Sequence, residues 1–395
     1  MALKLHNTLT NSVEEFVPIT PGQVSMYHCG PTVYDYVHVG NLRAFLLGDI
    51  VRRTCEYLGL KVRQVMNITD VGIGGNNDEG EDKILSGLKR EGKEVTMENM
   101  KTLGDFYTER FKEDTAALNI LPPHVLPKAS EHIAEMIGII QALDSKGFTY
   151  KIDDGVYFDT SKDPHYGKLG KLGKGLESRI ENSQKKNARD FALWKFNSNL
   201  GFPSPWGQGF PGWHIECSAM STTYLGKSFD IHTGGLDLAP VHHNNEIAQS
   251  ENACGCEFVR YWLHNEFVNV AQGKMAKSEG TGLTLSDVTK AGFSPLAYRY
   301  FLLLAHYRSP VTFSWEALTA AENAYEKLKK TVESLEEGGI VDADYKAKFT
   351  EKIENDLNTP QALAVAWTML KDKALPPSVR LATLKDFDKV LGLGL

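Results

Sequence analysis

Two short strings, more than two hundred residues apart, contain residue types that bind phosphate groups. The first is His38-Val39-Gly40-Asn41, which follows an alternating segment and opens a helical pattern of apolar residues. Free backbone N–H groups and the helix dipole favour an anion at such a helix start, and Gly40 lets the chain approach closely. The second is Lys274-Met275-Ala276-Lys277-Ser278, whose two ammonium groups suit phosphate as movable point charges. Either string alone is also common in turns and solvated loops, but together they suggest triphosphate chemistry.

A second group of residues carries the donor atoms that zinc accepts. Cys29 ends the first strand-like segment, and Cys217 lies in Pro211-Gly212-Trp213-His214-Ile215-Glu216-Cys217. His242 and Glu246 are four residues apart at the start of a helical pattern, so they share one helical face. Thiolate, imidazole and carboxylate groups are all zinc ligands. The alternative is that both cysteines are small buried hydrophobes, and the spacing alone leaves both interpretations open.

The remaining cysteines favour structural roles. The chain has five cysteines, an odd number that, in an apparently cytosolic protein, argues against a disulfide framework. Cys254-Gly255-Cys256 has no nearby histidine partner, so we expect a turn there. Cys55 lies within the helical pattern that follows His38, and we expect it in the core.

Length, composition and charge set the outer limits. A chain of 395 residues is long for one core and predicts two to four domains. Its apolar stretches are too short to span a bilayer and its N-terminus lacks a signal-peptide core, so we expect a cytoplasmic protein. The net charge of −7 does not indicate general nucleic-acid binding. The basic stretch 162–189 is either a solvated loop or an RNA contact.

The elements that must position these residues form an α/β pattern. A strand at 24–29, a helix at about 41–57 and a strand at 61–68 read as a βαβ unit, which implies a parallel sheet. Residues 120–200 would interrupt the fold as an insertion, and 229–271 would complete the sheet. Farther on, a helical seam that Gly338-Gly339 would end is formed by Leu318, Ala321, Tyr325, Leu328, Val332 and Leu335. Another helix would begin at Pro360.

The order and settings of the two phosphate strings resemble the two signatures of class I aminoacyl-tRNA synthetases. Further segments, in the same order and over nearly the whole chain, resemble those of bacterial cysteinyl-tRNA synthetases. These segments are Cys29-Gly30-Pro31-Thr32-Val33-Tyr34-Asp35, Asn67-Ile68-Thr69-Asp70, the Pro211 to Cys217 string, Asp230-Ile231-His232, His242-His243 to Glu246-Ile247-Ala248-Gln249, and His306-Tyr307-Arg308-Ser309. The chain departs from the pattern at Asn41 and Ala276, where the class usually has histidine and serine. These two departures bear on the rate of the reaction.

The resemblance implies a fold and a division of the chain. We expect a class I Rossmann-like parallel-sheet catalytic domain with a connective insertion, followed by a C-terminal α-helical bundle. The expected divisions are the first half of the catalytic domain (1–119), the insertion (120–200), the second half (201–271), the lysine loop and stem-contact region (272–312) and the bundle (313–395). Nothing in the sequence corresponds to the anticodon-reading domain of the family, so we expect tRNA to be read mainly through its acceptor end.

The resemblance also implies the site residues. It assigns one zinc ion to Cys29, Cys217, His242 and Glu246, and the amino-acid pocket to Thr69, Trp213 and His232. His38, Gly40 and Asn41 would bind the phosphates of ATP, which enters with Mg²⁺, while Lys274, Lys277 and Ser278 would face the departing pyrophosphate. Adenosine would lie against Gly234 and Gly235, with Asp237 accepting from a ribose hydroxyl.

The reaction that follows is ATP-dependent activation of L-cysteine and transfer to the 3′ end of the cysteine tRNA. Zinc would separate cysteine from serine by binding a thiolate strongly and an alcohol weakly, whereas an ordinary pocket discriminates near-isosteres by only about 1–3 kcal/mol. We expect a monomer with no membrane attachment. Two other interpretations stay open at this point: a ligase that joins cysteine to an amino sugar through the same adenylate, and an inactive RNA-binding paralogue.

Overall fold

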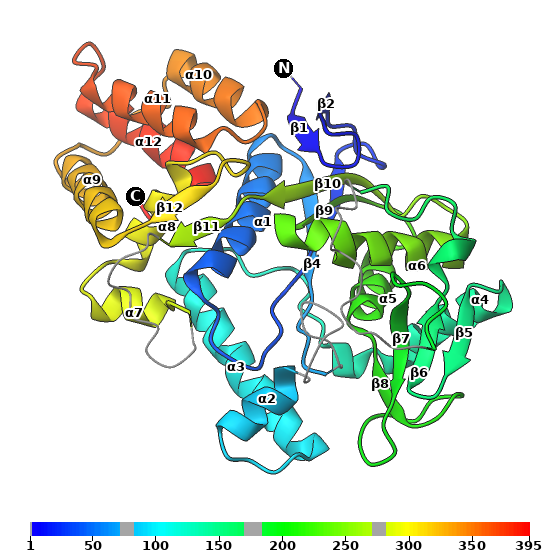
Figure 1. The fold of residues 1–395 in the computed structure, drawn as a ribbon. Coiled ribbons are helices and arrows are strands. Elements are labelled where there is room, and N and C mark those ends of the chain that lie inside the picture. The colour runs from blue at the N-terminus through cyan, green and yellow to red at the C-terminus, as the bar shows by residue number, and fades with distance from the viewer. Residues whose placement is uncertain (1, 72–82, 170–183, 271–281) are drawn as a thin grey trace.

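A parallel four-stranded sheet forms the centre of the molecule in the computed structural model, which describes residues 2–71, 83–169, 184–270 and 282–395 (Figure 1). Its strands stand in the order β10-β9-β3-β4. They are β3 (Gln23–His28), β4 (Lys61–Met66), β9 (Phe229–Gly235) and β10 (Val259–Asn265). β3 and β4 pair from Gln23↔Lys61 to His28↔Met66, which confirms the predicted βαβ unit. The α/β fold class expected from the sequence is confirmed.

Helices cover both faces of this sheet and separate two apolar cores. α1 (Val39–Tyr57) joins β3 to β4 and packs on one face, whereas α5 (Trp213–Leu225) packs against β3 and β4 from the other. β3 serves both cores because its side chains alternate: Met26 lies in the core with α1, and Tyr27 lies in the core with α5. Cys55 of α1 is fully buried, as predicted. The carboxyl ends of β3 and β9 therefore lie between two packed layers, which is where ligands bind in open α/β sheets.

The segments between β4 and β9 add helices and a second sheet. α2 (Lys83–Arg90) and α3 (Met97–Ala117) follow β4, and α4 (Ile133–Ser145) leads into the second sheet. That sheet is antiparallel throughout, with the order β5-β6-β7-β8. Its strands are β5 (Thr149–Ile152), β6 (Gly155–Phe158), β7 (Phe191–Phe196) and β8 (Gly209–Pro211). β8 lies beyond residue 200, where the sequence placed the end of the insertion, and runs directly into α5.

The rest of the chain is mainly helical. α6 (Asn244–Cys254) precedes β10, and β11 (Val268–Val270) pairs in parallel with β12 (Val311–Phe313). Near the N-terminus, β1 (Lys4–Asn7) and β2 (Ser12–Glu15) form a hairpin. The last helices gather at one end of the molecule (Figure 1). They are α7 (Leu285–Lys290), α8 (Pro295–Leu303), α9 (Trp315–Glu333), α10 (Ala343–Glu354), α11 (Thr359–Lys371) and α12 (Pro377–Leu391).

The helical end agrees with the sequence patterns except at one boundary. Leu318, Ala321, Tyr325 and Leu328 are buried on α9, as the seam predicts. The helix ends at Glu333, however, so Leu335 and Gly338 lie beyond it and the predicted end was too late. α11 has Pro360 in its first turn, and its Asn358 cap accepts a hydrogen bond from the backbone N–H of Gln361. No helix in the described part of the chain is both long enough and apolar enough to cross a membrane.

Candidate active site and metal centre

Four buried side chains with metal-binding atoms meet at the carboxyl end of the central sheet. Cys29 follows β3, Cys217 lies on α5, and Glu246 lies on α6, immediately after the turn that carries His242. Their ligand atoms all lie within 4.8 Å of one another, and all four residues are buried. These are the four residues that the sequence proposed as a zinc site. The structure thus brings them together from three separate elements and the segment that follows β3.

A π-helical turn sets the direction of His242. Residues Ala239–His243 form this turn, and α6 continues from it without a break. Nε2 of His242 lies 3.0 Å from Oε1 of Glu246, so the two side chains share a face as their spacing predicts. π-helical turns within helices are rare and are frequent at functional sites. The neighbouring His243 also points toward the cluster, and its Nε2 lies 3.9 Å from Oε1 of Glu246, three residues farther along the chain.

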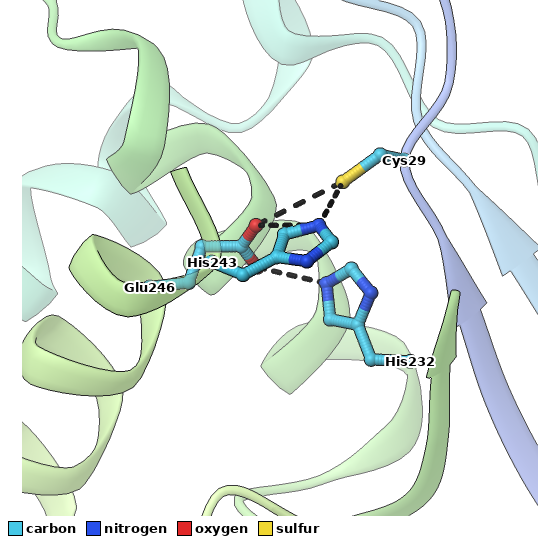
Figure 2. Close-up of side chains that lie close together, drawn as sticks. All are labelled: Cys29, His232, His243 and Glu246. Atoms are coloured by element: carbon cyan, nitrogen blue, oxygen red, sulfur yellow. Dashed lines mark hydrogen bonds and ion pairs between the residues drawn. The ribbon is translucent and has the colours of Figure 1, made fainter. Parts of the chain in front are cut away.

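A second buried group shares two residues with the first. Figure 2 shows His232 and His243 beside Cys29 and Glu246, and these four also have their ligand atoms within 4.8 Å of one another. Nε2 of His243 lies 3.2 Å from Sγ of Cys29, and Nε2 of His232 lies 3.0 Å from Oε2 of Glu246. The sequence assigned His232 to the amino-acid pocket and gave His243 no role. The His242-His243 doublet was the available signal for it.

Two further histidines hold the rings of His242 and His243 in place. Nδ1 of His214 lies 2.8 Å from Nδ1 of His242, and Nε2 of His264 lies 2.7 Å from Nδ1 of His243. In both inner rings the second nitrogen, Nε2, is thereby left to face the cluster. Partners of this kind fix the tautomer and orientation of metal-binding histidines. The sequence analysis missed His264, which lies on β10 far from the zinc-type motifs.

The electrostatics of the cluster favour ionised ligands. The hydrogen bond from Cys29 lowers the pKa of the Cys217 thiol, whereas burial raises the pKa of Cys29. Burial would raise the pKa of Glu246, but the nearby His232 and His242 together lower it. The pKa of His242 rises to about 10 because Glu246 and Cys217 outweigh the effect of burial. The protein therefore favours one thiolate and one carboxylate in its interior. Cys29 and His242 would each have to release a proton when a metal binds.

The residues expected to line the amino-acid pocket surround this cluster. The Trp213 ring lies 4.1 Å from the His242 ring, centroid to centroid, and the side chain is only partly buried. Trp213 is therefore not simply a core residue. Oγ1 of Thr69 donates to Oε2 of Glu216 at 2.7 Å. Glu216 is fully buried, has no hydrogen-bond partner for Oε1, and was not singled out from the sequence.

The residues predicted to face the nucleotide lie at the start of α1 and at the end of β9. His38 is the N-cap of α1 in an extended conformation, and both His38 and Asn41 are exposed. Loss of surrounding water lowers the pKa of His38, while the charge of the Asp237 carboxylate opposes this shift. Asp237 has the same effect on Lys83 of α2, a cation that the sequence analysis did not single out.

Backbone packing explains the glycines of the β9 motif. A Cβ atom at Gly234 would lie 2.9 Å from the His243 ring, and one at Gly235 would lie 2.4 Å from the Asp237 carboxylate. The His243 ring is buried and hydrogen-bonded, so a larger residue at Gly234 would displace part of the cluster. The exposed Asp237 side chain could instead move away from a Cβ atom at residue 235. The second phosphate string, with Lys274, Lys277 and Ser278, falls in 271–281, outside the described residues.

The structure also describes the Cys254-Gly255-Cys256 turn and part of the basic stretch 162–189. Cys254-Gly255-Cys256 is a turn, as predicted, with Gly255 in the left-handed conformation at the end of α6. The two cysteines are joined by a disulfide, which the sequence argument did not anticipate because it weighed only a larger framework. In the basic stretch 162–189, Lys168 pairs with Glu251 and Lys186 pairs with Asp159. These contacts within the chain favour a structural role for that pair of lysines.

Comparisons with known proteins agree with the geometry. A family model described as "tRNA synthetases class I (C) catalytic domain" matches residues 15–323. "Cysteine--tRNA ligase 1" of Burkholderia lata is 47% identical over 405 residues, covering 100% of this chain and 85% of that protein. "Cysteine--tRNA ligase" of Treponema denticola is 44% identical, covering 100% of this chain and 87% of its own length.

Solved structures share the fold at much lower identity. A Mycobacterium tuberculosis methionyl-tRNA synthetase bound by methionyl-adenylate matches with a TM-score of 0.60 and 14% identity, covering 94% of this chain and 90% of that one. At this identity the similarity concerns the fold alone. It confirms that the parallel sheet and the helices that follow it have the class I arrangement.

Proposed function

Because the chain belongs to the cysteinyl group of class I aminoacyl-tRNA synthetases, we propose that its buried cysteine, histidine and glutamate cluster is the site that selects cysteine. The reaction of the family joins an amino acid to tRNA with the consumption of ATP. Its substrates here are L-cysteine, ATP and the cysteine tRNA. The observation that carries the proposal is the meeting of four zinc-type donor atoms within 4.8 Å, close to Gly234 of the β9 motif.

Cys29, Cys217, His242 and Glu246 are the residues that would hold zinc, with His232 and His243 outside them. In this arrangement His243 can donate from Nε2 to the Cys29 sulfur, and His232 can donate from Nε2 to Glu246. The second group then orients the ligands of the first, as outer partners of metal sites commonly do. The lowered pKa of Cys217 supports its place among the ligands. The four donors fit zinc in number and type.

Zinc bound there would supply a strong affinity for thiolate over alcohol, which separates cysteine from serine. The protein contributes the shape around it. Trp213 closes one side of His242, and Thr69 is fixed by its hydrogen bond to Glu216. Both side chains are held by contacts within the chain, and such preorganised groups reduce the ordering needed on binding.

The other half of the site would handle ATP and Mg²⁺. The cysteine carboxylate attacks the α-phosphate in line and pyrophosphate leaves, so the chain mainly has to position groups and stabilise charge. His38, Gly40 and Asn41 would bind the phosphates at the start of α1. Gly234, Gly235 and Asp237 would bind adenosine, and Lys274, Lys277 and Ser278 would approach from the segment outside the described residues.

The proposal also includes the division of the chain into domains. We assign the catalytic halves to 1–119 and 201–271, the insertion to 120–200, the lysine loop and stem-contact region to 272–312, and the bundle to 313–395. A monomer in the cytoplasm without membrane attachment is part of the same proposal.

Pyrophosphate exchange into ATP tests this function. Cysteine should support exchange, and serine at the same concentration should support at least about a thousandfold less, beyond the roughly 200-fold that an ordinary pocket achieves. Addition of cysteine tRNA should then give a charged tRNA, whereas an amino sugar offered as acceptor should give no product. Exchange without cysteine dependence, or transfer to the sugar in place of tRNA, would refute the proposal.

A further inference from the structure

Arg43 of α1 binds the main chain of two distant segments at once. The residue is only 3% exposed. Its Nη1 donates to the carbonyl oxygens of Glu266 and Phe267 at 3.0 and 2.9 Å. Its Nη2 donates to the carbonyl oxygens of His306 and Ser309 at 3.0 and 2.7 Å. The planar guanidinium presents several donors in a fixed fork, so it can hold four carbonyls in one arrangement, which a lysine cannot do.

The two segments that Arg43 holds form one unit. Residues 266–267 connect β10 to β11, and residues 306–309 connect α8 to β12. The Glu266 N–H donates to the Tyr307 carbonyl at 2.8 Å, and the Val311 N–H donates to the Phe267 carbonyl at 3.1 Å. Since β11 and β12 also pair in parallel, a shift of one segment must move the other. Arg43 therefore fixes this whole unit relative to α1.

The unit leads directly to the segment that contains the lysines. β11 ends at Val270, and Lys274 and Lys277 follow within the next seven residues of the sequence. On the far side of that segment, the Val39 N–H donates to the Leu283 carbonyl at 2.8 Å, and His38 forms an antiparallel bridge with Thr284. Both flanks of 271–281 are thus bonded to the first two turns of α1. The same turns carry His38 and Asn41.

We propose that Arg43 is a positioning residue for adenylate formation, which holds the chain leading to the lysines in a fixed relation to the phosphate site at the start of α1. The inference rests on the proposed function, because that function assigns His38, Asn41 and the lysines to ATP. Misplacement of reacting groups by about 1 Å can cost about a hundredfold in rate. The His306-Tyr307-Arg308-Ser309 motif, whose individual residues have no role in the proposed function, supplies two of the four carbonyls.

Arg53 provides a matched control on the same helix. It is also buried, and its guanidinium donates to both Asp49 oxygens and to the carbonyls of Asn119 and Lys389. These partners lie outside the unit that Arg43 holds. Loss of either guanidinium should therefore reduce stability, but only loss of the Arg43 group should change the rate of activation.

The test compares Arg43→Lys, Arg43→Ala and Arg53→Lys in cysteine-dependent pyrophosphate exchange, with activities expressed per folded molecule. Both Arg43 variants should lose at least about tenfold in kcat, while KM for cysteine changes by less than about threefold. Zinc content per folded molecule should equal that of the wild type. Guanidinium ions at millimolar concentration should restore part of the kcat of Arg43→Ala, and Arg53→Lys should keep its kcat within about twofold.

Three outcomes would overturn the inference: a wild-type kcat per folded molecule in Arg43→Lys, an equal loss of kcat in Arg53→Lys, or a failure of every Arg43 variant to fold. The last outcome would assign Arg43 to folding alone. Failure of the proposed function is distinguishable from all three, because it would show as a wild-type protein without cysteine-dependent exchange.

Discussion

Glu246 connects the two histidine groups at the centre of the site. Its Oε1 lies 3.0 Å from His242, and its Oε2 lies 3.0 Å from His232. All three side chains are buried, where an unpaired charge is costly. The carboxylate can serve as a ligand through one oxygen and remain oriented through the other. This division explains why the residue lies in the first turn of α6, directly after the π-helical turn.

Replacement of one sulfur should remove the metal without removing the fold. Cys217→Ser keeps the size of the side chain, but an alcohol stays protonated and is a poor zinc ligand. We expect the variant to lose most of its zinc and to activate cysteine at least about a hundredfold more slowly. Metal analysis and pyrophosphate exchange check this. Cys55→Ala, a buried cysteine outside the cluster, should keep its zinc, and full zinc in Cys217→Ser would contradict the assignment.

The residue types of the site were readable from the sequence, but part of its composition was not. Cysteine, histidine and glutamate at Cys29, Cys217, His242 and Glu246 indicate metal chemistry wherever the fold brings them together. The contributions of Glu216, His243 and His264 depend on contacts between α5, the π-helical turn and β10. The spacing of three residues places His243 near Glu246, but its contacts with Cys29 and His264 come from other elements, which helical spacing does not describe.

At the scale of elements, long periodic segments were predicted well and short ones poorly. α1 and the two strands beside it follow from clear apolar patterns, and Pro360 and Asn358 mark the start of α11. The strands of the antiparallel sheet are only three to six residues long, too short for an alternating pattern to identify. Their pairing is also non-local, since β6 and β7 lie on either side of a long connection.

α3 contains an acid in an unfavourable place, which gives a pH-dependent prediction. Asp114 lies in its last turn, near the negative end of the helix dipole, and burial raises its pKa to about 6 from an ordinary 3.8. The folded protein therefore binds this proton more tightly than the unfolded chain. Ionisation of Asp114 costs stability as the pH rises through 6, and the cost disappears below 3.8, where both states are protonated.

Asp114→Asn should thus raise the free energy of unfolding at pH 8 by about 1 kcal/mol, a value reduced for partial solvent screening. At pH 4 the variant and the wild type should be nearly equal. Urea unfolding at both pH values measures this. Glu109→Gln, an exposed acid on the same helix, serves as the control and should change little at either pH. Equal stabilisation at both pH values would show that ionisation of Asp114 is not the cause.

At the scale of the whole molecule, one buried network joins the central sheet to the helical end. Asp49 of α1 binds Arg53 on its own helix and Arg299 of α8, with the Arg299 Nη2 at 2.6 Å. Nε of Arg299 donates to the Leu391 carbonyl at the end of α12, and its Nη1 donates to the Leu118 carbonyl after α3. The Asp49 carboxylate thus holds the Arg299 guanidinium in place, and this guanidinium connects α8 to the ends of α3 and α12.

Asp49→Asn should therefore destabilise the whole molecule and leave the metal site intact. Asparagine keeps the shape but removes the carboxylate that is bonded to two buried guanidinium groups, and breaking a buried ion pair typically costs about 3–5 kcal/mol. Urea unfolding should show this loss, while zinc content per folded molecule stays at the wild-type value. Glu56→Gln is the matched control, because the Arg52–Glu56 pair has the same spacing on α1 but is partly exposed, so it should cost less than about 1 kcal/mol. If both variants lose the same small amount, Asp49 does not join the helical end to the sheet, and the apolar contacts of α1 with α12 must hold them together.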